Sequence, residues 1–282
     1  GTGGECALDV GKVVGAGKNA DVNGDLIVIM GCKPNTKIPL LFAGADDANV
    51  NGNVELTITS GNFGKVFGGN NEGGVIRGHI KLNIEETGDC GTPITIDELY
   101  LGGNEAAYSV YGYYLDSNSE LQPRTAETHN ITDPNAEGYK EAIGNPATDA
   151  THTFPFAQPE LNIISCTSIG QVFGGGLGST AIIYGNPTVN INMIPGNNAS
   201  NIKRNGSANA HDLGAIGDVY GGGDAAAVYG NTTVNIGTAE TVTVKSMTYD
   251  AETDTYTADT ANVEGAYITG NVYGGGKLAN VG

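Results

Sequence analysis

The sequence predicts an all-β chain folded as a parallel β-solenoid, and three observations lead to this prediction. Glycine supplies 45 of the 282 residues without a collagen-like triplet, which indicates many tight turns between short extended segments. Similar segments recur along the chain. Within these segments apolar and polar residues alternate with the period of two that is typical of β-strands.

The repeat is clearest over residues 219–237, which read VYGGGDAAAVYGNTTVNIG. Further copies, complete, worn or truncated, start at Val13, Val66, Leu99, Val172 and Val272. Self-similarity of this kind is the sequence signature of solenoids. The starts are unevenly spaced, and we assign the excess length to insertions that leave the regular path. Two further alternating segments, 53–58 and 161–164, are predicted to supply strands of neighbouring coils.

One copy contains three extended pieces separated by turns. Val219 and Tyr220 precede the triplet Gly221–Gly223, where we expect a sharp turn through backbone conformations that other residues avoid. Residues 227–229 form the second piece and residues 232–236 the third. Such a coil buries its apolar side chains only when it stacks on its neighbours, so stacked coils are expected to share one continuous core.

We expect a single domain over residues 1–282 with three insertions. The first, at about 116–158, is polar and contains four prolines; the second, at about 196–212, is rich in Asn, Ser and Gly. The third, at about 245–262, has Tyr249 and Tyr256 on either side of an acidic turn, as in a β-hairpin. The incomplete last copy predicts that the natural protein continues, and an uncovered end predicts possible end-to-end self-association.

The composition argues against two classes of partner. Lys and Arg number 13 against 31 Asp and Glu, for a formal charge of −18, and no basic stripe exists to bind nucleic acid. The most apolar run, 26–30, is too short for a transmembrane segment. The four cysteines (Cys6, Cys32, Cys90 and Cys166) form no C-x-x-C pair. We expect them to be small buried hydrophobes, with one or two disulfides left open.

The VYGGG segments, followed by A-x-V-x-G-x-T-x-V-x-I, resemble repeats in large surface proteins of gut bacteria. The matching residues are 66–69, 172–176, 219–223 and 272–276, each with its following strand. The resemblance covers about half of the chain. It implies a right-handed parallel β-helix, an extracellular or cell-surface location (secreted or attached to the outer membrane) and an adhesin-like role in contacting polymers.

We predict no metal site and no cofactor. Residues 19–25 resemble the start of a calcium loop, but Met30 stands where a bidentate acid is needed. Asp224 follows two glycines, yet the second Gly-Asp step of a calcium-binding nonapeptide is missing. The segment VFGGGLGST at 172–180 lacks the lysine of a phosphate loop. All three segments are better interpreted as turns.

The candidate ligand surface is an aromatic cluster, Tyr108, Tyr111, Tyr113 and Tyr114. Strand alternation would place Tyr111 and Tyr113 on one face, and Tyr108 and Tyr114 on the other. Exposed tyrosines can stack on sugar rings while they donate hydrogen bonds. The alternative is that one face of the cluster fills the core.

The function we expect is non-catalytic adhesion or ligand presentation, with host or microbial glycans or surface proteins as partners. One alternative is a polysaccharide-active enzyme, a lyase or glycoside hydrolase, which would need two carboxylates and a basic residue together in a long groove. A passive stalk is the other. Acidic residues are scattered among the loops, so no catalytic residue is assigned.

Overall fold

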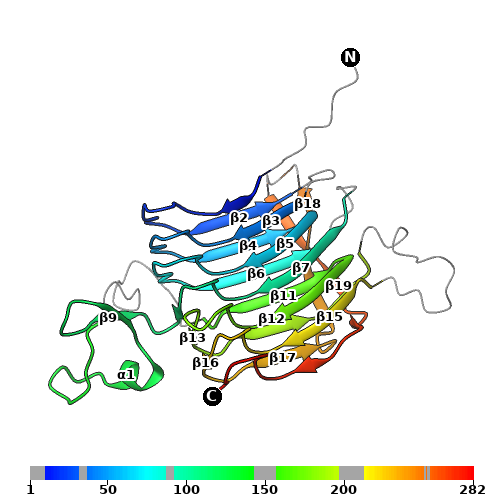
Figure 1. Ribbon diagram of the computed structural model, residues 1–282. Helices are drawn as coiled ribbons and strands as arrows, with labels where there is room; N and C mark the ends of the chain where they lie inside the picture. The colour runs from blue at the N-terminus through cyan, green and yellow to red at the C-terminus, as the bar shows by residue number, and fades with distance from the viewer. Residues whose placement is uncertain are drawn as a thin grey trace.

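The computed structural model describes residues 10–31, 37–86, 92–142, 157–196, 213–250, 252 and 255–282, with the backbone only for 245–250 and 255–258. These residues form an all-β protein built mainly of parallel sheets (Figure 1). One helix is present in the described chain, the five-residue α1 (Ala126–Asn130), and it has no buried residue. No helix of this part of the chain has the length and hydropathy needed to cross a membrane.

Sheet 1 is the largest, with eight strands. They are β1 (Lys12–Val14), β3 (Lys37–Phe42), β5 (Gly61–Phe67), β7 (Ile94–Tyr100), β12 (Ser168–Phe173), β15 (Ala215–Tyr220), β20 (Tyr267–Ile268) and β21 (Val272–Tyr273). Every neighbouring pair is parallel, and β20 and β21 both pair with β15. The sheet therefore joins strands from both ends of the described chain.

Two smaller parallel sheets complete the stack. Sheet 2 contains β2 (Leu26–Met30), β4 (Val54–Ile58), β6 (Ile80–Glu85), β11 (Glu160–Ser165), β14 (Thr188–Ile191) and β17 (Thr233–Ile236). Sheet 3 contains β8 (Tyr108–Ser109), β13 (Ile183–Tyr184) and β16 (Val228–Tyr229). Earlier in the chain, parallel bridges take the place of sheet 3 between sheets 1 and 2, at Val22, Val50 and Ile76. The chain thus visits sheet 1, sheet 3 and sheet 2 in constant order, and we call each circuit a pass.

The strand register confirms the repeat and adds a copy that the glycine pattern does not show. One register position of sheet 1 holds the first residue of every predicted copy: Val13, Val66, Leu99, Val172, Val219 and Val272. Leu41 lies at the same position between Val13 and Val66, so that interval holds two passes. Its copy was overlooked because Ala43 and Ala45 interrupt the glycine pattern. Segments 53–58 and 161–164 contain most of β4 and β11, as expected.

The core is a column of inward-facing aliphatic side chains. In β6, Ile80, Leu82 and Ile84 are fully buried and alternate with Lys81 and Asn83. The same alternation continues through the neighbouring strands because identical positions are in register. Neighbouring passes therefore share one apolar core, in which no pass is buried by its own residues alone.

A second column of aromatic rings lies one residue after the copy starts. Its members are Phe42, Phe67, Tyr100, Phe173, Tyr220 and Tyr273. Successive ring centroids are 4.6 to 5.0 Å apart and the planes differ by 5° to 11°. This spacing matches the separation of neighbouring strands, about 4.8 Å, because each ring is contributed by the next strand. Phe67, Tyr100 and Phe173 are buried in a cluster separate from the main core.

The glycine triplets are needed for close approach, and the expected special backbone conformation is wrong. Gly221–Gly223 are absent from the described glycines with positive φ. A Cβ on Gly175, however, would lie 2.5 Å from the backbone nitrogen of Gly223 in the next pass. A Cβ on Gly102 would likewise lie 2.8 Å from the nitrogen of Gly176. Glycine is required at the middle position of the triplet, because there the backbones of successive passes leave no room for a side chain.

The insertions leave this stack at defined places. The first follows β9 (Tyr113–Leu115) and contains α1 and β10 (Leu121–Pro123), which pairs antiparallel with β9; Figure 1 shows this region projecting to one side. The third is an antiparallel hairpin, β18 (Thr241–Asp250) and β19 (Thr255–Asn262), which pairs Tyr249 with Tyr256 as expected. Residues 143–156 and 197–212, which hold the rest of the first insertion and nearly all of the second, lie outside the described residues.

The cysteine prediction can be followed at one position. Cys166 is fully buried in the core with no disulfide partner, as expected for a small hydrophobe. Burial raises the pKa of its thiol well above the usual value. Cys6, Cys32 and Cys90 lie outside the described residues.

We expect Gly175→Ala to lower the free energy of unfolding by about 1–3 kcal/mol, because the new methyl group overlaps the backbone of the next pass. Gly275→Ala is the matched control. It changes the middle glycine of the last triplet, where an added Cβ has nothing within 4 Å. Urea unfolding followed by circular dichroism gives both values. Equal stability losses in the two variants would contradict the close-approach explanation.

Candidate ligand-binding groove

Two tyrosines of the predicted ligand surface are part of the packing. Tyr108 lies in the core beside Ile183, and its hydroxyl donates a hydrogen bond of 2.9 Å to the carbonyl of Gly78. Tyr113 is also buried, and its hydroxyl donates to the carbonyl of Ala107 at 3.0 Å. Burial raises the pKa of both phenols far above the ordinary value. Neither ring is placed to stack on an external ligand.

The other two tyrosines remain partly exposed. Tyr111 packs against His129 with ring centroids 5.5 Å apart, and the Lys140 ammonium lies 5.1 Å from the ring centroid of Tyr114. The predicted alternation of the four rings is wrong because the chain turns at Gly112, which has a φ of 84°. Tyr108 and Tyr113 therefore belong to separate strands, β8 and β9, and the side chains of both are buried. A ligand role for this cluster stays a prediction, now centred on Tyr111 and Tyr114.

Tyr108→Phe is expected to lower the free energy of unfolding by about 1 kcal/mol, because it leaves the buried Gly78 carbonyl without its partner. Tyr114→Phe, at a partly exposed ring, is expected to change stability by only a few tenths of that amount. Chemical denaturation of both variants measures the difference. If the two losses were alike, the buried hydrogen bond would not hold Tyr108 in place.

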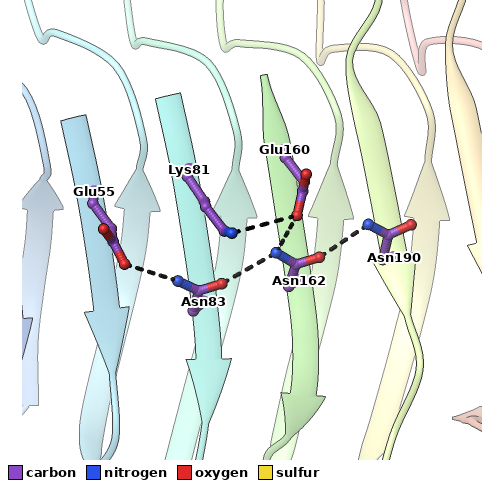
Figure 2. Close-up of polar contacts among 6 residues, drawn as sticks. All are labelled: Glu55, Lys81, Asn83, Glu160, Asn162 and Asn190. Atoms are coloured by element: carbon purple, nitrogen blue, oxygen red, sulfur yellow. Dashed lines mark hydrogen bonds and ion pairs between the residues drawn. The ribbon is translucent and has the colours of Figure 1, made fainter. Parts of the chain in front are cut away.

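Asparagine side chains form a continuous column on the outer face of sheet 2. Asn83, Asn162, Asn190 and Asn235 occupy one register position on β6, β11, β14 and β17. Each amide nitrogen donates to the amide oxygen of the preceding member, at 3.1 Å (Asn162 to Asn83), 2.9 Å (Asn190 to Asn162) and 2.8 Å (Asn235 to Asn190). Figure 2 shows the part of the column from Asn83 to Asn190.

Charged residues flank the column two positions earlier. Glu55, Lys81 and Glu160 occupy one register position on β4, β6 and β11. Glu160 Oε1 accepts from Asn162 Nδ2 at 2.6 Å and lies 4.0 Å from Lys81 Nζ. Glu55 Oε1 accepts from Asn83 Nδ2 at 3.3 Å. Both carboxylates thus turn toward the asparagines, as Figure 2 shows, and the lysine between them is paired with Glu160.

The base of the β18–β19 hairpin forms a wall beside this face. The backbone nitrogen of Thr238 donates to Asn192 Oδ1 at 2.9 Å as the chain leaves sheet 2. On its return, Met193 exchanges backbone hydrogen bonds of 2.8 Å with Glu264 and Gly265. Met193 is fully buried in the core, so both ends of the hairpin are tied to the stack. Figure 1 shows β18 (orange) extending toward the N-terminal strands.

Between the wall and the column lies an open groove of about 440 Å³. Its floor includes Lys81, Glu160 and the asparagine column, and its wall includes Thr238, Ala239, Val242 and Thr243. We call it the sheet 2 groove. No group of three His, Cys, Asp or Glu side chains suited to a metal ion occurs among the residues that the structure describes.

The floor keeps part of its hydrogen-bonding capacity for a ligand. A primary amide has two N–H donors and an oxygen with two lone pairs. Asn190 uses one donor toward Asn162 and one lone pair toward Asn235, so one donor and one lone pair remain. Among the residues that the structure describes, the side chain of Asn235 is bonded only to Asn190. The groove therefore offers fixed donors and acceptors side by side, with no charge that stands alone on its floor.

Sequence reasoning missed this groove, although the signal for its floor was present. The tripeptides 82–84, 161–163, 189–191 and 234–236 all place asparagine between two aliphatic residues. Their alternation predicts strands, and the recurring identity of the outward residue is the signal for the column. The wall could not be found in this way, because the local pattern of a hairpin does not say which face it will lie against.

Comparison with known proteins provides no match. No protein-family model matches the chain, and neither a curated protein nor a solved structure matches it significantly.

Proposed function

We propose that the chain is a right-handed parallel β-helix that serves as a bacterial surface or secreted module for adhesion and ligand presentation, without catalysis. The constant order of sheets 1, 3 and 2 supports the β-helix, since each pass returns to the same three faces. Right-handedness follows the general preference of parallel crossover connections. The exported location rests on the resemblance of the VYGGG repeats to surface proteins.

The sheet 2 groove is the observation that carries the proposal. An adhesive module needs a fixed surface that keeps its shape without a ligand. Here the floor is held by a strand ladder and by amide–amide hydrogen bonds. The wall is anchored by backbone bonds to Met193. A passive stalk has no need for such a groove.

A polysaccharide-active enzyme is the second candidate, and one observation favours it. Glu55 and Glu160 lie two strands apart with Lys81 between them, a backbone separation of about 9.6 Å from the strand spacing. Inverting glycosidases hold their two carboxyl groups about 6.5–9.5 Å apart. Against this, Glu160 is already bonded to Asn162 and paired with Lys81, which ties up a carboxylate that would have to act as acid or base.

An array of glycans and surface proteins, with mass spectrometry of the same wells, tests the proposal. We expect the purified chain to bind at least one polymer and to release no cleavage product. Glu160→Gln should then alter affinity only modestly, because the amide preserves the shape of the side chain and its oxygen can still accept the hydrogen bond from Asn162. Cleavage that Glu160→Gln abolishes would establish the enzyme instead. Absence of binding to every polymer would favour the stalk.

A further inference from the structure

We infer that the sheet 2 groove is the binding site and that its ligand is an uncharged polysaccharide chain. This inference rests on the proposed function and specifies its site and ligand class. It also transfers the ligand role from the tyrosine cluster, where two of four rings are buried, to the asparagine column.

The hydrogen-bonding pattern of the floor selects a polyhydroxylated ligand. Each spare donor of the column lies next to a spare acceptor, as on Asn190 and Asn235. A hydroxyl group both donates and accepts, so neighbouring sugar hydroxyls can satisfy both groups of one amide at once. A peptide that binds by strand addition needs a free strand edge. β11 and β14 are paired on both sides and offer none.

The charges disfavour an anionic ligand. The chain as a whole carries a formal charge of −18, which repels polyanions at long range. Within the groove the lysine of the floor, Lys81, is paired with Glu160. The wall residues Thr238, Ala239, Val242 and Thr243 bear no charge. An anionic polysaccharide would thus meet a lysine that is already paired with Glu160. It would also be repelled by the negative charge of the chain as a whole.

The repeat of the column favours a polymer over a single sugar. From Asn83 to Asn235 the column crosses β6, β11, β14 and β17, a span of about 14 Å at the usual strand spacing. An asparagine recurs at every strand along that span, and Asn190 and Asn235 on neighbouring strands keep spare donors and acceptors. A polymer with repeating hydroxyl groups can contact several of them together, and such linked contacts raise affinity beyond that of one unit.

The test measures binding of a panel of soluble neutral polysaccharides (dextran, mannan, galactan and xylan) by isothermal titration calorimetry. Polygalacturonate and a library of uncharged polar peptides serve as comparators. Asn190→Ala should weaken the binding of a neutral polysaccharide by about tenfold, since it removes the hydrogen bonds made by one amide. Thr243→Trp should weaken it too, by filling the groove from an exposed wall position without touching the floor.

Asn51→Ala is the matched control. Asn51 donates to Asn23 and accepts from Arg77 in a similar chain of bonds between successive passes, which lies outside the groove. The Asn51→Ala variant should bind the neutral polysaccharide with the affinity of the wild type. Neutral polysaccharides could bind with an affinity that neither Asn190→Ala nor Thr243→Trp lowers. In that case the assignment of the groove as the binding site is wrong, while the adhesive function stands.

Preferential binding of polygalacturonate or of the peptides would overturn the ligand class. Failure of the wild-type chain to bind any of the neutral polysaccharides would overturn this inference, whereas the array of glycans and surface proteins decides the proposed function separately. Affinities are compared only for variants that match the wild type in circular dichroism spectrum and unfolding midpoint. If Asn190→Ala is unstable, Thr243→Trp supplies the test.

Discussion

The constant register between successive passes is the constraint on which the rest of the structure depends. Parallel strands about 4.8 Å apart place equivalent residues directly above one another. Every favourable or unfavourable contact at one position is therefore repeated along the stack. Val66, Leu99 and Val172 follow one another in the core, and the next residues Phe67, Tyr100 and Phe173 stack their rings.

The same constraint explains why polar residues also occur in columns. An asparagine on one strand finds its best neighbour in another asparagine, because each amide can donate in one direction and accept in the other. Asp46, Asn71 and Asn104 form a second such chain at the bend after sheet 1, with bonds of 2.6 and 3.0 Å. The sheet 2 column differs in that a hairpin wall encloses it. That enclosure turns a stabilising ladder into a surface that can hold a ligand.

Much of the stack could be predicted from the sequence, because the register repeats a local pattern. The copy starts, the strands at 53–58 and 161–164 and the hairpin around Tyr249 and Tyr256 all follow from alternation and turn residues. The copy at Leu41 lacks the glycine pattern because alanine stands at positions 43 and 45. The need for glycine was attributed to φ, but it comes from contact between passes, which a single copy does not reveal.

The candidate site was harder to predict because it depends on contacts between distant segments. Alternation failed for the tyrosines since Gly112 breaks the strand between Tyr108 and Tyr113. The groove needs β6, β11 and β14 in register and a hairpin folded back against them. Only the first of these conditions leaves a trace in the sequence, as the recurring Asn between aliphatic residues.

Cysteine cross-linking across sheet 2 tests the register most directly. Thr188 and Thr233, on β14 and β17, are register partners, whereas Asn235 lies two residues further along β17. A disulfide needs Cα atoms about 4.4–6.8 Å apart, which adjacent partner positions satisfy. We predict that Thr188→Cys with Thr233→Cys forms a disulfide under mild oxidation, seen by mass spectrometry of peptides, and that Thr188→Cys with Asn235→Cys does not. Equal cross-linking of both pairs, or cross-linking of the second pair alone, would contradict the register and with it the columns.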